Sequence, residues 1–140
     1  MSLDRESPPS MSAFQELSRL YQEWRRLSEA EGEAIRRQEW PVVEDCQGAK
    51  YKLQSVITMA TELYLADLAH PGGDPADYDR QFRGIVAELI QLEERNGQWL
   101  EDQKRRAREQ QEELARTTAS LRQVRRAYAS GKAAAWTSYS

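Results

Sequence analysis

The chain has 140 residues, of which 31% are charged, and it contains seven Gly, five Pro and only two Phe. This balance favours one charged helical domain with a moderate core and disfavours a sheet protein. The net charge of -3 hides an asymmetry, since 15 basic and 23 acidic residues up to Glu113 give −8 and five basic residues follow with no acid. A basic end suits an acidic protein surface, nucleic acid or anionic lipid.

The compartment is indicated by cysteine usage and by the N-terminus. Cys46 is the only cysteine, which excludes an internal disulfide framework and fits a reducing compartment. The opening stretch MSLDRESPPS is polar and has no apolar signal region, and no apolar run approaches the length of a membrane span. We therefore expect a cytoplasmic protein without membrane insertion.

The first helix is expected over residues 12–38, after a disordered segment at residues 1–11. Ser12 and Gln15 have capping-box spacing, and the SPPS stretch before them opposes helix. Apolar residues then recur close to the helical period as far as Ile35.

The second helix is expected over residues 41–70, because Pro41 suits a first helical position and HPGGDP after residue 69 forces a turn. Its apolar residues alternate by four and three, which predicts a heptad-like seam. The seam comprises Val42, Cys46, Ala49, Leu53, Val56, Ala60 and Leu63.

The third helix is expected over residues 75–129, with Asp74 as its N-cap. It carries two apolar seams. The first comprises Phe82, Ile85, Leu89, Leu92, Asn96 and Trp99, and the second comprises Leu114, Thr117, Leu121, Val124 and Tyr128. The two seams do not share one heptad register, so we expect a stutter or a break near Gln103.

The unequal helix lengths decide the architecture. At 1.5 Å per residue the first two helices are each about 40 Å long and the third about 80 Å if it is continuous. We expect an all-α fold: a three-helix antiparallel bundle (up-down-up) with a long third helix that overhangs the bundle. The domain would span residues 12–129, followed by a flexible tail at residues 130–140. The second seam must then find another chain, fold back or stay partly exposed.

The seams predict a core of large apolar residues from all three helices. These core residues are Trp24, Leu27, Leu53, Val56, Leu89, Leu92 and Trp99. One glycine of each helix falls about 30 Å from the bottom of the bundle by the helical rise, namely Gly32, Gly48 and Gly97. Either the helices approach closely at this level, with Asn96 fixing the register against Gln47 or Glu31, or Gly97 faces solvent and the alignment is chance.

No set of residues indicates catalysis. Cys46 and His70 would lie about 36 Å apart on one helix, which excludes a Cys–His catalytic pair within one chain. We interpret Cys46 as a small core residue and His70 as a cation at a helix end. Asp67 and His70 have metal-ligand spacing, but a carboxylate-bridged metal bundle needs a second histidine. No phosphate loop is present, and no Lys or Arg is seen on the first two seams. We expect no enzyme, no metal, no cofactor and no small-molecule substrate.

The basic end offers two weaker interpretations. Arg122, Arg125 and Arg126 cluster on neighbouring turns, yet a recognised DNA-binding motif is lacking, so a solvated face is preferred to nucleic-acid binding. Trp136 and Tyr139 lie in the tail, which we interpret as disordered or as a docking segment.

Three stretches resemble the FlgN/FliT-like flagellar export chaperones: LSEAEGEAIRRQEWPVVEDCQGAKYKLQ, IVAELIQLEERNGQWLEDQ and LRQVRRAY. The resemblance covers roughly residues 17–128. It implies a small helical chaperone that binds C-terminal amphipathic segments of late export substrates and presents them to the export gate. By position, Tyr128 would match the family's C-terminal tyrosine, implicated in gate docking, and Asn96 the family's asparagine.

The leading hypothesis is therefore a cytoplasmic flagellar (type III) export chaperone. The alternative is a structural, self-assembling coiled coil or helical bundle, a homodimer whose second seam pairs with its own copy. A nucleic-acid-binding regulator is a weaker alternative. The predicted partner-binding residues are Leu114, Thr117, Leu121, Val124, Tyr128, Arg122, Arg125 and Arg126. The sequence leaves open the cargo, the oligomeric state and the continuity of the third helix.

Overall fold

The computed structural model describes the backbone of residues 12–139 and the side chains of residues 12–131. It has three helices, α2 (Ala13–Arg37), α3 (Trp40–Leu68) and α4 (Asp77–Tyr139), and no strand within the described range. The all-α prediction is confirmed. The expected disordered segment at residues 1–11 lies outside the described residues, as do the side chains of Trp136 and Tyr139.

The helix ends follow local sequence signals. Ser12 caps α2 by a capping box with Gln15, as predicted. α2 ends at Arg37, and its C-cap Gln38 has a left-handed φ of 59°. Pro41 lies in the first turn of α3, where a missing N–H costs nothing. Asp74 accepts a hydrogen bond from the Ala76 N–H (2.9 Å) in the turn before α4.

Two expectations for the third helix are corrected. α4 begins at Asp77 and runs as one helix through Gln103 to Tyr139, so the break alternative and the end at residue 129 are both wrong. Residues 101–113 are polar but rich in Glu, Gln, Arg and Lys, which are strong helix formers. The change of seam register therefore does not interrupt the helix.

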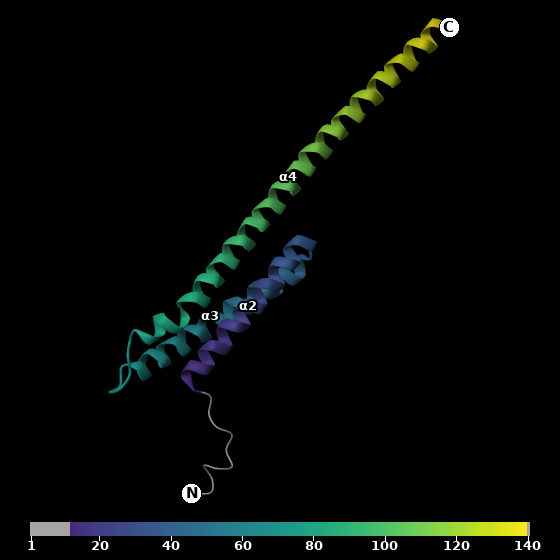
Figure 1. Cartoon of the computed structure of the whole chain (residues 1–140). Coiled ribbons are helices and arrows are strands. Elements are labelled where there is room, and N and C mark those ends of the chain that lie inside the picture. The colour runs from purple at the N-terminus through teal and green to yellow at the C-terminus, as the bar shows by residue number, and fades with distance from the viewer. Residues whose placement is uncertain (1–11, 140) are drawn as a thin grey trace, which may run out of the picture. The chain divides into compact units, whose positions relative to one another are not determined.

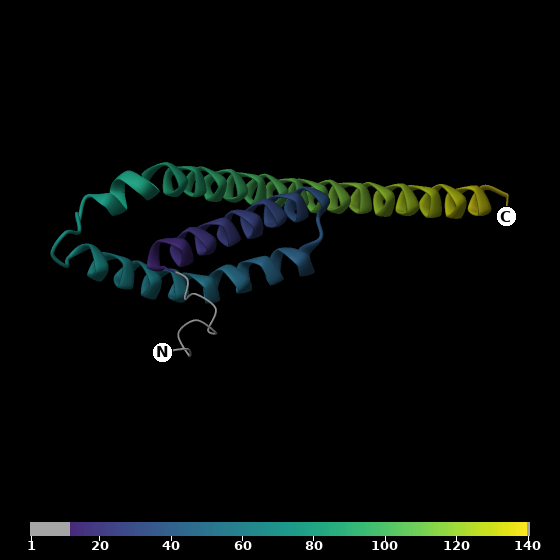
Figure 2. The same cartoon turned by 60° about the horizontal axis from the view of Figure 1, so that its bottom comes forward.

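The chain divides into two compact units. The first, called the bundle below, contains residues 12–100: α2, α3 and the first part of α4. The second, called the C-terminal segment, contains residues 101–139. In the bundle α2 packs against α3, and side chains of both contact the first part of α4. These three stretches run up, down and up (Figures 1 and 2).

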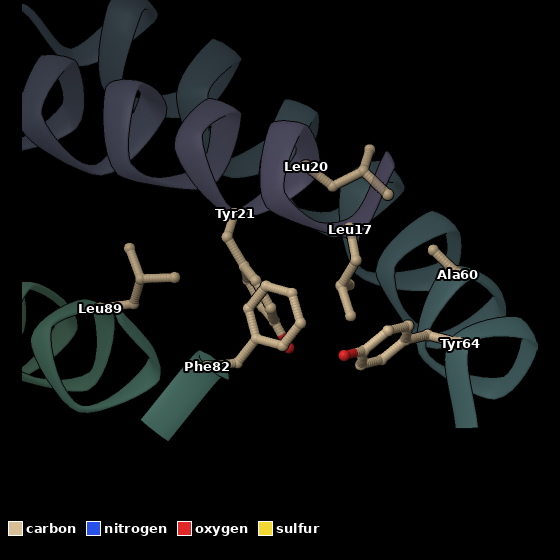
Figure 3. Packing of buried hydrophobic residues seen from close by; sticks show 7 residues of the cluster. All are labelled: Leu17, Leu20, Tyr21, Ala60, Tyr64, Phe82 and Leu89. Carbon is tan, nitrogen blue, oxygen red and sulfur yellow. The ribbon is translucent and has the colours of Figure 1, made fainter. Parts of the chain in front are cut away.

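One hydrophobic cluster with aromatic rings at its centre forms most of the bundle core. Figure 3 shows Tyr21, Tyr64 and Phe82 pointing toward one another at its centre. The rings of Tyr64 and Phe82 meet edge to face at 5.6 Å, and the hydroxyls of Tyr21 and Tyr78 are 2.8 Å apart. The buried members are Leu17, Leu20, Tyr21, Ala60, Tyr64, Phe82 and Leu89. Aromatic burial on this scale contributes a large share of core stability.

The predicted core is right in part. Leu27 and Leu89 are buried, and Trp24, Leu53, Leu92 and Trp99 are half-buried. Val56 is 46% exposed, so its assignment to the core was wrong. The reason is the register of α3, whose inward line comprises Val43, Cys46, Lys50, Leu53, Ile57, Ala60 and Tyr64. One position of this line is Lys50. A seam built from apolar residues alone leaves Lys50 out, and it therefore included Ala49 and Val56 in place of Lys50 and Ile57.

Candidate functional site

A buried polar layer crosses the bundle at Lys50. The Lys50 Nζ lies 3.0 Å from the Glu31 Oε1 of α2, and 2.7 Å and 2.9 Å from the two carboxylate oxygens of Glu93 on α4. The side chains of Lys50 and Glu31 are only 7% and 5% exposed. Glu93 also accepts hydrogen bonds from the Ser28 hydroxyl (2.7 Å) and the Trp24 indole N–H (3.1 Å). The layer therefore ties all three helices together by charge-assisted hydrogen bonds.

This layer corrects the expectation that no Lys lies on the first two seams. A buried ammonium is tolerated where carboxylates pair with it, and Lys50 has two. Burial raises the pKa of Glu93, but hydrogen bonds from Lys50 and Ser28, with the Lys50 charge, outweigh it and hold that pKa below its ordinary value. Among the described side chains, no buried polar atom lacks a hydrogen-bond partner. Such a satisfied layer fixes helix pairing.

Asn96 joins the same layer. Its Nδ2 donates to the Ser28 carbonyl (2.7 Å) and to the Glu31 Oε1 (3.0 Å), so the structure joins Asn96 to one of its two expected partners. A Cβ on Gly32 would lie 2.6 Å from the Asn96 Oδ1, which is too close for a real contact. A side chain at residue 32 would therefore force Asn96 to move, where α2 approaches α4.

The other two glycines of this level behave differently. A Cβ added at Gly48 or at Gly97 would meet nothing within 4 Å, and both residues are exposed. The close approach thus involves one of the three glycines, and Gly97 faces solvent. The structure therefore fits the second interpretation for Gly97, in which its common height with Gly32 and Gly48 is a coincidence.

An open groove of about 440 Å³ runs between α3 and α4 in the bundle. Tyr21 and Trp24 of α2 line it. Its walls are formed by Gln54, Ile57 and Thr58 of α3 and by Tyr78, Val86, Leu89, Ile90, Glu93 and Glu94 of α4. The groove is thus mainly apolar, with two carboxylates at one end. No sequence pattern pointed to it, because its residues come from three separate helices.

A second apolar surface lies on α3. Tyr51, Met59 and Leu63 are exposed, although they belong to the most hydrophobic helix of the bundle. None of the three lines the groove. Met59 and Leu63 therefore provide matched apolar positions outside the groove for comparison.

The predicted partner-binding residues form an exposed stripe on the C-terminal segment. Leu114, Leu121, Val124 and Tyr128 are 63–71% exposed, and Thr117 is also exposed. We call these five residues the stripe. Arg122, Arg125 and Arg126 flank it and, with Ala129, line a shallow depression. One helix therefore presents apolar and basic side chains together, with no acidic residue after Glu113.

The residues considered for catalysis do not form a site. Cys46 is a buried free thiol whose pKa is raised by burial and by the neighbouring Glu31 carboxylate, the opposite of what a nucleophile needs. His70 lies in the turn after α3. The described side chains include no group of three or more His, Cys, Asp or Glu placed to hold a metal ion.

No helix within the described range contains a stretch both long and apolar enough to cross a membrane. Comparison of the chain with protein-family models, with curated proteins and with solved structures finds no match. The resemblance to flagellar export chaperones therefore rests on the sequence pattern quoted above.

Proposed function

We propose that this protein is a cytoplasmic export chaperone of the flagellar (type III) class, which binds amphipathic C-terminal helices of late export substrates and carries out no catalysis. The observation that carries the proposal is the stripe. Four large apolar side chains recur there at helical spacing and are about two-thirds exposed. An amphipathic helix with no partner is a common surface for binding a second helix.

The composition of the stripe defines the partner. Burying its apolar side chains under a partner helix contributes about 25 cal/mol for each Å² removed from water, part of which is offset by the entropy lost on association. The flanking Arg122, Arg125 and Arg126 favour a partner with acidic residues beside its apolar face, mainly by raising the association rate. Amphipathic export segments with acidic flanks would meet both requirements.

The resemblance supports the same class. It implies that such chaperones keep their cargo unassembled and present it to the export gate, with a tyrosine near the C-terminal end engaged there. Tyr128 is the matching residue, and it is exposed at the end of the stripe. We therefore assign cargo binding to Leu114, Thr117, Leu121 and Val124, and gate docking to Tyr128.

The test is a titration of the full-length protein with C-terminal peptides of hook-junction and filament-cap proteins, followed by calorimetry. Wild type is expected to bind at least one of them. Leu121→Asp together with Val124→Asp should weaken binding more than tenfold and leave the melting of the bundle unchanged. Met59→Asp is the control, because Met59 is equally exposed but lies on α3. Equal binding by the double variant, or no binding by wild type, would contradict the proposal.

The second candidate is self-assembly, and the same stripe favours it. In this alternative two copies of the stripe pair as a coiled coil. The peptide titration separates the candidates, because a purely structural protein would bind no export peptide. Its mass in solution would instead be that of a dimer, and it would fall by half in the double variant.

A further inference from the structure

The bundle carries an open apolar groove, and the C-terminal segment carries an unpartnered apolar stripe. We propose that the groove between α3 and α4 binds the stripe of a second copy, so that two copies exchange stripes and form a closed dimer. This inference goes beyond the proposed function: it describes the protein without cargo, because a cargo helix and the groove of a second copy would compete for the same stripe.

The groove has the shape and chemistry that a helix needs. Side chains of α2, α3 and α4 line it, so an added helix would complete a four-helix bundle, which is a standard packing arrangement. Ile90 lines one wall and is 53% exposed. An apolar side chain that projects into an open groove gains stability when another helix covers it.

The charges of the two surfaces are opposite. Residues 12–100 contain 10 basic and 16 acidic residues, a balance of −6. Residues 114–131 contain four arginines and no acid. Glu93 and Glu94 line one end of the groove, and Glu94 is exposed. Opposite charges beside an apolar contact speed association and disfavour wrong orientations.

The continuity of α4 favours a second copy over the same chain. A stripe that folded back onto its own groove would require residues 101–113 to leave the helical conformation, which they hold throughout. A second copy supplies an identical groove without that cost. Each chain has one groove and one stripe, so two copies satisfy both and close the assembly.

The experiment is a complementation test of mass in solution. The groove variant is Thr58→Arg with Ile90→Arg, and the stripe variant is Leu121→Asp with Val124→Asp. All four side chains are exposed, so both variants should melt like wild type at concentrations low enough for wild type to be monomeric. The control is Met59→Arg with Leu63→Arg, which places the same charges on α3 outside the groove.

Sedimentation velocity is then measured over a range of concentrations. Wild type and the control should be dimers, and each variant alone should be a monomer. An equimolar mixture of the two variants should recover a dimer at high concentration, because one intact groove still meets one intact stripe. Glu94→Arg should weaken the wild-type dimer about fivefold or more.

Four results would overturn the inference. A wild type that stays monomeric would show that the groove binds no second copy. A groove variant that stays dimeric would show stripe-to-stripe pairing. A mixture that stays monomeric at high concentration would show that groove and stripe do not meet. Species that keep growing beyond a dimer would show an open chain of copies.

Discussion

The bundle and the C-terminal segment share one helix but place its apolar side chains in opposite environments. On α4, Phe82 and Leu89 are buried in the bundle core, whereas Leu121 and Val124 are about two-thirds exposed. Both stretches are helical. Amphipathic spacing alone therefore does not show that a face is covered. In the C-terminal segment helix formation depends on strong helix formers and on local pairs such as Arg116–Glu113 (2.8 Å), each worth less than about 1 kcal/mol.

The largest expected difference between the two regions concerns charge. Lys50→Ala should lower the free energy of unfolding by about 3–5 kcal/mol, because it leaves the buried Glu31 carboxylate without its cation. Lys104→Ala should cost less than about 0.5 kcal/mol, since the Lys104–Glu101 pair is exposed. Urea denaturation measures both. Similar losses at the two positions would mean that the polar layer is open to water.

Apolar truncation should give the next largest contrast. Leu17 is fully buried, so Leu17→Ala should cost about 2–5 kcal/mol. Leu121→Ala should change stability by less than about 0.5 kcal/mol at concentrations where the protein is monomeric. Thermal melting monitored by circular dichroism measures both. A large loss at Leu121 in the monomer would show that the stripe packs on its own chain.

The two glycines near the polar layer should respond with opposite signs. Gly32→Ala forces a Cβ against the Asn96 Oδ1 and should cost about 1–3 kcal/mol. Gly97→Ala meets open space and should stabilise the helix by about 0.5–1 kcal/mol. Denaturant midpoints decide the signs. Destabilisation at both positions would indicate that α4 approaches another helix on the Gly97 side as well.

The smallest expected effect is on pH dependence. Because the pKa of Glu93 is lower in the folded state than its ordinary 4.5, its contribution to stability is complete above that pH. The contribution is lost as the pH falls through the folded-state pKa. Melting temperatures between pH 6 and pH 3 should therefore fall less steeply in Glu93→Gln than in wild type. Parallel curves would mean that Glu93 is not the group that titrates.

The sequence predicted the features that depend on neighbouring residues. Three helices, the Ser12 capping box and the turn after α3 all follow from local spacing and from Pro and Gly. The stripe was also predicted, because its pattern is complete within one helix. These features need no knowledge of what packs against what.

The features that depend on tertiary partners were missed. Lys50 was excluded from the α3 seam because a lysine is buried only when carboxylates are present to pair with it, and Glu93 lies 43 residues away. Leaving out Lys50 shifted the predicted inward face of α3, and Val56 was wrongly assigned to the core as a result. A line of residues at Val43, Cys46, Lys50 and Leu53, spaced three and four, was the signal available. The groove had no comparable signal.

The contrast between the two regions is tested most directly by amide hydrogen exchange along α4, measured at several protein concentrations. Amides between residues 89 and 99 should be strongly protected at every concentration, because the bundle core covers them. Amides between residues 104 and 128 should exchange rapidly in dilute protein, and those of the stripe should slow as concentration rises and a second copy occupies it. Equal and concentration-independent protection across both stretches would contradict the account, since it would mean that the C-terminal segment is packed within its own chain.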